Sequence, residues 1–334
     1  MKAFFATLLV FTTLLSCKTE TTTNTQESLP LKTGDWHAVL DVQDGKQLPF
    51  TFKVNDNNTL TVFNAEEEVN VEDINVEGDT ITIQFPVYEG IIKGTFDSTN
   101  ISAKYIKPSL NRIVNFTAAY GKKDRFEIED EPSVDMSGSW ETIFSPGTED
   151  SYVAKGIFKQ DGNTLTGTFR TTTGDYRYLE GVVYGNYFEL STFDGAHAFL
   201  FSGQVEGDQL KGTFYSGNHF KEPFEAMRND AYELPDANSL TYIKDGYDGL
   251  EFTFPNLKGE SISLNDDNLK GKVRIIQIMG TWCPNCLDES RYLADYYSIS
   301  LLDLGALAWH STDFNSDTES DGGNNFWSGD EEVG

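Results

Sequence analysis

The chain is poor in basic residues, and this shortage excludes one large class of partner. Its 334 residues include 25 Lys and Arg against 53 Asp and Glu, which gives a formal net charge of −28 at pH 7. A polyanion gains nothing from the counterions that nucleic-acid phosphates release on binding, so nucleic acid is excluded as a partner. Such a charge is typical of a soluble, well-solvated surface outside the cytoplasm.

Cysteine is also scarce, and the three cysteines lie in two unrelated places. Cys17 ends the N-terminal stretch MKAFFATLLVFTTLLSC, whereas Cys283 and Cys286 lie together in the motif WCPNC. A zinc ribbon needs a second cysteine pair or two histidines at ligand spacing. The four histidines of this chain are scattered singly, so no metal site is predicted.

No apolar run is long enough to cross a bilayer. The run from Ala3 to Leu15 follows a basic residue and has the length of the hydrophobic region of a secretion signal. The LLSC that ends it resembles the bacterial lipobox, in which cleavage before the cysteine leaves its thiol to carry diacylglycerol. We therefore predict a signal peptide over residues 1–16, lipidation of Cys17, and a polar tether over residues 17–30. The alternative is a plain signal peptide with an incidental cysteine.

Helical periodicity is absent from Leu31 to about Asp230. Segments of period two, such as TFKVNDNNTLTVF and GIFKQDGNTLTGTF, are separated by Asp-Gly, Asn-Asn and similar turn signals. About ten residues for each strand with its turn indicates antiparallel meander topology.

An internal repeat divides this β-rich region. Gly-Asp-Trp at 34–36 is followed by Gly-Ser-Trp at 138–140, an offset of 104 residues, and other matches drift little from that offset. We predict two tandem antiparallel β-barrel or sandwich modules, over residues 31–126 and 136–230. We interpret both tryptophans as core residues of their own modules, the alternative being that they stack on a ligand.

The pattern changes after a loop-rich linker over residues 231–247. The apolar run VRIIQIM, Val273–Met279, indicates a buried strand, and a helix is expected over Cys283–Tyr297, with Pro284 in its first turn. At a helix N-terminus, unpaired N–H groups and the helix dipole stabilise a thiolate, here that of Cys283. Cys286, one turn on, would then resolve a mixed disulfide. The pattern predicts thiol–disulfide exchange with no cofactor beyond this dithiol pair.

Two other interpretations of the cysteine pair, beside the zinc ribbon, are less favoured than redox chemistry. Haem attachment needs histidine directly after the second cysteine, where Leu287 stands. A purely structural disulfide would close so short a loop that it restrains little of the unfolded chain. Asp194, His197 and His219 form a weaker constellation near one end of the second module, for which surface or packing roles are favoured.

The segment FTFPNLKGESISLNDDNLKGKVRIIQIMGTWCPNCLDE resembles the opening of the redoxin domain of TlpA-like thiol-disulfide oxidoreductases, in the thioredoxin-like superfamily. The β-rich stretches before it resemble the region preceding this domain in lipoproteins of Bacteroidetes-type bacteria. The resemblance implies a partial α/β thioredoxin-like domain over residues 248–297. In it, Cys283 is the nucleophile, Cys286 is the resolving thiol, and Trp282 and Pro284 shape access and potential. Residues 298–334 depart from the family and are predicted to be a divergent acidic tail.

The sequence thus predicts a lipoprotein exported to a bacterial membrane, facing the periplasm or the cell surface. Its predicted function is thiol–disulfide oxidoreduction, impaired if the chain ends at residue 334. The implied partners are the lipid bilayer, exported proteins that carry disulfides, and a membrane electron donor. The alternative is a surface β-barrel lipoprotein that binds a ligand or a partner and carries a vestigial redox domain.

Overall fold

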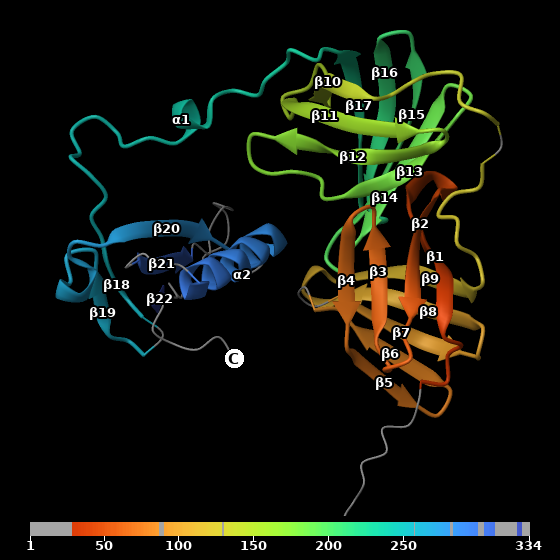
Figure 1. Ribbon diagram of the computed structural model, residues 1–334, viewed down its shortest axis with the longest axis horizontal. Helices are drawn as coiled ribbons and strands as arrows, with labels where there is room; N and C mark the ends of the chain where they lie inside the picture. Colours follow the sequence, from red (N-terminus) through yellow and green to blue (C-terminus); the bar gives the residue numbers. More distant parts are fainter. Residues whose placement is uncertain are drawn as a thin grey trace, which may run out of the picture.

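The computed structural model describes residues 29–86, 90–128, 130–256, 258–280, 283–299, 304–310 and 326–328. Two antiparallel β units follow one another, and a smaller C-terminal unit lies beside them (Figure 1). Among the described residues, α2 (Pro284–Ile299) is the one α-helix longer than four residues. The molecule is therefore mainly β with two barrel-like sheets, as the sequence predicts.

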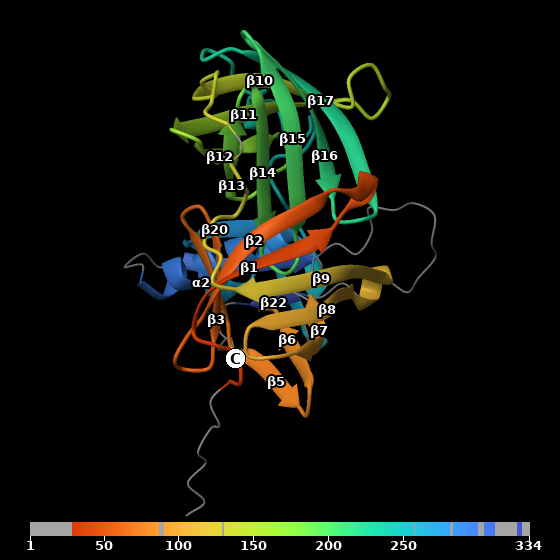
Figure 2. The same ribbon diagram turned by 90° about the vertical axis from the view of Figure 1, so that its right-hand side faces the viewer.

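The first β unit is a nine-stranded sheet in the order β4-β3-β2-β1-β9-β8-β7-β6-β5. Its elements are β1 (Gly34–Asp41), η1 (Gln43–Gly45), β2 (Gln47–Val54), β3 (Leu60–Asn64), β4 (Glu67–Val71), β5 (Asp73–Glu77), β6 (Thr80–Gln84), β7 (Ile91–Phe96), β8 (Asn100–Lys107), η2 (Pro108–Leu110) and β9 (Arg112–Tyr120). The edge strands β4 and β5 are consecutive in the chain, and the sheet curls around a common interior (Figure 2).

The second β unit is a closed barrel of eight antiparallel strands, in which β10 pairs with β17. Its strands are β10 (Gly138–Phe144), β11 (Tyr152–Asp161), β12 (Thr164–Thr171), β13 (Leu179–Tyr184), β14 (Tyr187–Phe193), β15 (Ala198–Glu206), β16 (Gln209–Ser216) and β17 (Phe220–Arg228). Closure leaves this sheet without an unpaired edge.

The two repeat tryptophans occupy equivalent places in the two β units. Trp36 and Trp140 have no exposed surface, and each indole N–H donates a hydrogen bond of 2.9 Å to the carbonyl oxygen four residues earlier, Lys32 or Met136. Trp36 opposes the last residue of β9 and Trp140 opposes the last residue of β17. The structure thus confirms both the repeat and the assignment of the tryptophans to the core.

The glycine two residues before each tryptophan is required by the backbone. Gly34 has φ of +125° and Gly138 has φ of +110°, a region that side-chain-bearing residues rarely adopt. Each glycine begins the first strand of its unit. The matched Gly-x-Trp of the sequence therefore marks a backbone turn followed by a core residue.

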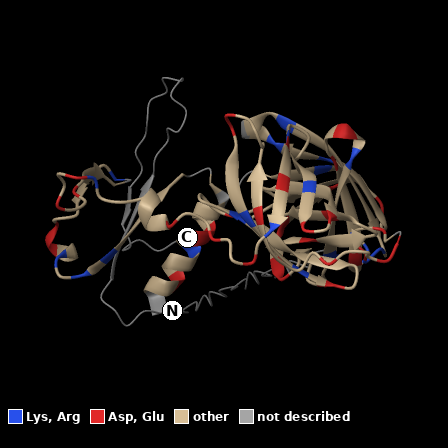
Figure 3. Ribbon diagram, turned by 90° about the horizontal axis from the view of Figure 1, so that it is seen from above, with Lys and Arg blue, Asp and Glu red and all other residues tan. Residues whose placement is uncertain are grey.

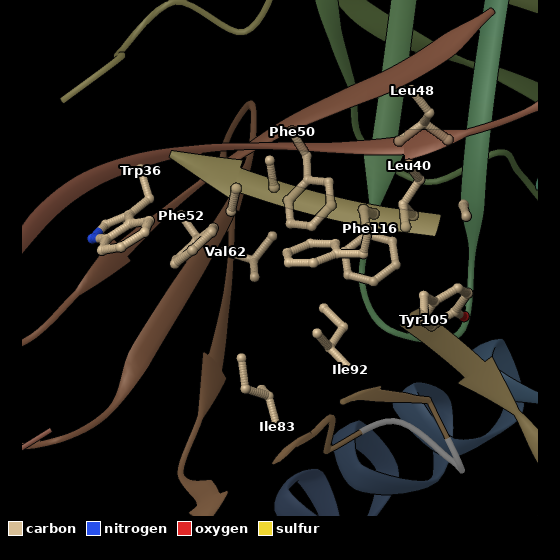
Figure 4. Packing of buried hydrophobic residues seen from close by; sticks show 14 of the residues in the cluster. Trp36, Leu40, Leu48, Phe50, Phe52, Val62, Ile83, Ile92, Tyr105 and Phe116 are labelled. Carbon is tan, nitrogen blue, oxygen red and sulfur yellow. The ribbon is translucent and has the colours of Figure 1, made fainter. Parts of the chain in front are cut away.

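The two β units share a hydrophobic core. Phe193, from β14 of the barrel, stacks on Phe50 of the first unit with ring centroids 4.3 Å apart. It also meets the rings of Phe85 and Tyr105 edge-on, at 5.1 and 5.2 Å. Figure 4 shows Phe50 in this interior with the other inward side chains of the first unit. The two units are therefore packed as one body, whereas the domain boundaries in the sequence stay a prediction.

The C-terminal unit is small and follows an extended segment that carries α1 (Ala237–Leu240) (Figure 1). Its elements besides α2 are β18 (Thr253–Pro255), β19 (Ser261–Ser263), η3 (Asp267–Leu269), β20 (Val273–Met279), β21 (Leu304–His310) and β22 (Phe326–Ser328). β18 and β19 form their own hairpin, whereas β20 pairs in parallel with β21 and β21 pairs antiparallel with β22.

The strand that precedes the cysteine pair forms as predicted, but it is not buried. Val273 is 63% exposed and Ile278 is 64% exposed, and the buried residue of β20 is the polar Gln277. The sequence indicates a strand buried on both faces, so the prediction of β20 is right in its secondary structure and wrong in its burial. Two further strands, β21 and β22, lie in the segment predicted as an acidic tail.

Basic and acidic residues are interspersed along the described strands and loops (Figure 3). Acidic residues outnumber basic ones across the whole chain. In the part of the chain that the structure describes, we find no helix with both the length and the apolar character needed to span a membrane.

Candidate binding cleft

A cleft of about 1320 Å³ lies on the outer face of the first β unit, where this unit meets the barrel. Its lining comes from β1, β2, β8 and β9, from the segment that leaves β9, and from β14 of the barrel. The lining residues are His37, Val39, Gln47, Pro49, Asn100, Ile101, Thr117, Ala118, Ala119, Gly121, Lys122, Lys123, Asp124, Arg125, Phe126, Glu127, Ile128 and Glu189.

Strand alternation builds the floor of the cleft. Successive side chains of a strand point to opposite faces of the sheet. On β1, Trp36 points into the core, so the alternate residues His37 and Val39 point outward, toward the cleft. Val39 lies opposite Pro49 on β2, and His37 lies opposite Ala119 on β9. The floor is therefore mostly apolar, with one imidazole in it.

The roof of the cleft is the segment over residues 122–128, held down by Arg125. The Arg125 side chain is 2% exposed, and its Nη1 donates hydrogen bonds of 3.1 Å to both the carbonyl oxygen and the hydroxyl of Ser191 in the barrel. Its Nη2 donates to the carbonyl oxygen of Phe63, and its Nε lies 3.7 Å from a carboxylate oxygen of Glu180. One side chain thus ties the roof to both β units.

The Arg125 side chain keeps its positive charge although it is buried. Desolvation lowers the pKa of this guanidinium to about 10, and the nearby Glu180 carboxylate opposes the shift. The group is therefore still protonated near neutral pH. Because its acceptors belong to β3 and β14, the guanidinium is a structural tie between the two units and faces away from solvent.

His37 is the titratable group of the cleft floor, and it is neutral at pH 7. Its Nε2 lies 3.0 Å from the carbonyl oxygen of Arg125, so this nitrogen carries the proton and donates to the roof. Burial lowers the pKa of His37, and the positive charges of Lys122 and Arg125 lower it further, against the effect of the hydrogen bond. The imidazole therefore offers a polar surface to a ligand without adding charge.

The rim of the cleft is charged but internally paired. Lys122 lies 3.1 Å from Glu127 within the roof, and Glu189 of the barrel lies 3.3 Å from Lys46. The lining residues contain no cysteine and no carboxylate hydrogen-bonded to the imidazole. An apolar floor with a mixed charged rim suits the binding of an amphipathic ligand, and it supplies no nucleophile with an adjacent base.

The cysteine pair predicted from the sequence lies elsewhere, at the junction of β20 and α2. The sulfur atoms of Cys283 and Cys286 are 2.6 Å apart, and the backbone N–H of Cys286 donates to the Cys283 sulfur over 3.3 Å. Burial and the contact with Cys283 raise the pKa of the Cys286 thiol. The helix begins at Pro284, as predicted. The role of these residues stays a prediction, and Cys17 and Trp282 lie outside the described residues.

Gln277 connects the cysteine pair to the strand before it. Its amide nitrogen donates to the Cys286 carbonyl oxygen at 3.2 Å and to Glu289 at 3.0 Å, while its amide oxygen accepts from Ser290 at 2.9 Å. These bonds satisfy the one buried polar side chain of β20. The pattern of an apolar strand assigns no role to Gln277.

The weaker constellation of the second module is only partly assembled. His197 Nδ1 lies 2.8 Å from Asp194, whose pKa is lowered by His197 and Arg177 against the effect of burial. His219 faces Arg112 and Lys107 instead, and burial together with these two charges lowers its pKa to about 4. Within the described residues, no cluster of three or more His, Cys, Asp or Glu side chains has a geometry that would hold a metal ion.

The assignment to the TlpA-like thiol-disulfide oxidoreductases is wrong, and so is the predicted classification of the chain as a thioredoxin-like redox enzyme. The described residues are nearly all β and contain no thioredoxin-like α/β domain. β18 and β19 stay outside the sheet of β20, and one long helix packs beside it. A thioredoxin-like sheet needs helices over its apolar faces, and the exposed side chains of β20 lack that cover. The predicted partners that depend on this assignment, disulfide-bearing exported proteins and a membrane electron donor, are therefore unsupported as well.

Of the two functions predicted from the sequence, the structure supports a β-barrel binding or interaction protein better than an oxidoreductase. No protein-family model matches the chain, and no curated protein matches it in sequence.

Among solved structures, one similar chain is a tryptophan-to-alanine mutant of the vaccine antigen transferrin-binding protein B from Haemophilus parasuis Hp5. It shares 9% sequence identity, and the match covers 58% of this chain and 68% of that one with a TM-score of 0.18. The fold assignment is made from the strand pairing of the two β units.

The cleft itself was missed by sequence reasoning. Its key residue, Arg125, stands in the run KKDRFE at the end of the first predicted module. Residues 122–128 fold back over β1 and β9. An arginine followed by phenylalanine in an otherwise polar run was the available signal, since Phe126 is also buried.

Proposed function

We propose that this protein is a lipid-anchored β-barrel protein that binds an amphipathic ligand, such as a short peptide segment, in the cleft between its two β units. One observation carries the proposal: both units line the cleft, and the buried Arg125 holds its roof against both. Ligand sites favour such junctions, where an apolar surface is joined by a few placed polar groups. The volume of about 1320 Å³ is ample for a ligand of this size.

The cleft predicts binding of an apolar, charged probe. The fluorophore 1-anilinonaphthalene-8-sulfonate combines apolar rings, which suit the cleft floor, with a sulfonate that stays at the polar rim. Replacing Val39 with glutamate puts a charge on the floor of the cleft and removes an apolar contact with the fluorophore. We expect the fluorophore affinity to fall about tenfold, which corresponds to about 1.4 kcal/mol of binding free energy. Fluorescence titration of the folded variant measures this change.

The matched control is Val153→Glu, the same substitution at a valine that is 37% exposed on β11 of the barrel and does not line the cleft. Its affinity for the fluorophore should equal that of the unchanged chain. Equal affinities for all three proteins would show that the fluorophore binds elsewhere and would remove the support for the cleft.

The anchor is proposed from Leu-Leu-Ser-Cys17 and places the β units at a membrane surface. Expressed in a bacterium that processes lipoproteins, the unchanged protein is expected to enter the detergent phase on Triton X-114 partition. Cys17→Ala should stay in the aqueous phase, because stable anchoring needs more than one acyl chain and the thiol carries two of them. Cys283→Ala removes a different thiol and should partition like the unchanged protein; retention of Cys17→Ala in detergent would contradict the anchor.

A further inference from the structure

Glu222 is a buried carboxylate inside the closed barrel. It shares the inward face of β17 with Phe224 and Ala226, and the residue is 6% exposed. Its two oxygens accept hydrogen bonds of 2.6 Å from the hydroxyls of Ser145 and Tyr152. Among the described residues, no Lys, Arg or His forms an ion pair with it, although buried charges in proteins are normally paired with an opposite charge.

Aromatic rings surround the approach to this carboxylate. The ring of Tyr176 lies in their centre, 5.4 Å from Phe144, 5.6 Å from Phe199 and 5.0 Å from Phe214 between centroids. The Tyr176 hydroxyl meets that of Tyr152, which in turn donates to Glu222. Burial, together with the negative charge of Glu222, raises the pKa of Tyr176 to about 12, so its hydroxyl stays protonated.

Tyr176 belongs to the connection between β12 and β13, over residues 172–178, and not to a barrel strand. This connection, here called the plug loop, is exposed from Thr172 to Asp175. Its Arg177 has φ of +65°, a conformation that costs energy in a residue with a side chain. The backbone N–H of Tyr176 donates to the carbonyl oxygen of Phe169 on β12 at 3.0 Å, so an outward movement of the loop has to break this bond, whereas the rings around Tyr176 sit on strands.

Ion pairs of Arg177 hold the plug loop in place. Its guanidinium contacts three carboxylates from three different segments: Glu67 on β4, Asp194 after β14, at 3.2 Å, and Asp288 on α2, at 2.6 Å. Three acids around one arginine leave excess negative charge at this end of the barrel, in a chain of net charge −28. Such a field attracts cations.

A second, independent feature of the barrel interior points to a ligand. The hydroxyl of Thr192 is buried with no hydrogen-bond partner in the described part of the chain. Thr192 follows Phe188 and Leu190 on the inward face of β14, and it pairs across the ladder with Phe199 of the ring cluster. The oxygen lone pairs of an unsatisfied buried hydroxyl beside the rings can face a cationic ligand that enters there.

We propose that this end of the barrel binds an organic ammonium cation, with Tyr176 as an internal plug that occupies the site until the plug loop moves out. Glu222 supplies the counter-charge, and Phe144, Phe199 and Phe214 supply the ring faces that attract quaternary ammonium groups. The Tyr176 phenol stands where the ligand would lie, with its hydroxyl directed at the Tyr152–Glu222 pair. The site shares no residue with the cleft and does not depend on it.

The test uses choline as the cation and 3,3-dimethyl-1-butanol as a neutral molecule of the same shape. Isothermal titration of the full chain should show that Tyr176→Ala binds choline about tenfold more tightly than the unchanged chain, because the plug no longer competes. Adding Glu222→Gln in this background should reduce choline affinity about tenfold, since the counter-charge is lost. The neutral alcohol should show no measurable binding to Tyr176→Ala or to the double variant.

Tyr178→Ala is the matched control, because Tyr178 belongs to the same loop but is 50% exposed. Its choline affinity should equal that of the unchanged chain. Equal binding of choline and the neutral alcohol by Tyr176→Ala would show a simple apolar cavity and overturn the proposal. Choline affinity that survives Glu222→Gln would overturn it too.

A second measurement covers the case in which Tyr176→Ala does not fold. Saturating choline should raise the thermal midpoint of the unchanged chain more than the neutral alcohol does, and the difference should vanish in Glu222→Gln. Equal midpoints in both additives for the unchanged chain would overturn the proposal without any change at Tyr176.

Discussion

Replacing Arg125 with methionine is expected to lower the free energy of unfolding by about 3–5 kcal/mol, the range seen when one partner of a buried ionic network is removed. The side chain is 2% exposed, and it satisfies the carbonyl oxygens of Phe63 and Ser191. Methionine keeps the apolar volume but removes these hydrogen bonds from a charged donor, each worth about 1.5–3 kcal/mol, and leaves Glu180 without its ion pair. Urea unfolding followed by circular dichroism measures the difference.

Lys123→Met is the control for Arg125, two residues away in the same roof segment. Its ammonium is 79% exposed and pairs on the surface with Asp35, so its loss should cost about 0.5 kcal/mol or less. If the two substitutions have the same small effect, Arg125 does not tie the β units together, and the roof of the cleft is held by other contacts.

Phe193→Ala is expected to destabilise the two β units together, by about 3–5 kcal/mol, the usual cost of truncating a buried phenylalanine. Phe193 belongs to the barrel, but its ring lies in the core of the first unit against Phe50, Phe85 and Tyr105. We therefore expect the β region of the unchanged chain to unfold in a single transition, and the variant to show two. Differential scanning calorimetry distinguishes these outcomes.

Phe220→Ala provides the comparison for Phe193, because it removes the same ring from a position that is 44% exposed on β17. It should cost about 1 kcal/mol or less and keep the single transition, as expected away from the core. Two separate transitions in the unchanged chain would show that the shared core is too weak to couple the units.

The cysteine motif shows which features a local sequence pattern predicts and which it does not. The strand, the turn with its two thiols and the helix beginning at Pro284 were all predicted from sequence, and all are present. What failed was the inference from this piece to a whole domain. A strand and a helix depend on nearby residues, whereas a thioredoxin-like sheet depends on distant strands pairing in a given order, and β18 and β19 pair only with each other.

The binding cleft was beyond sequence reasoning for a related reason. Alternation along β1 predicts that His37 and Val39 point away from the core, but not what covers them. That cover comes from residues 122–128 and from Glu189, about 150 positions further along the chain than His37. The tie that holds it, Arg125, has acceptors on β3 and β14, which only the packed units bring together.

The sequence by itself determined the strands, the repeat and the core tryptophans, because alternating burial and turn residues act over a few positions. Gly34 and Gly138 with their tryptophans already marked where each β unit begins. Only the tertiary structure decided that the second sheet closes through β10 and β17 while the first ends at β4 and β5. It alone decided that Phe193 faces the neighbouring unit. Closure and packing depend on hydrogen bonds and contacts between residues far apart in the chain, which no local period encodes.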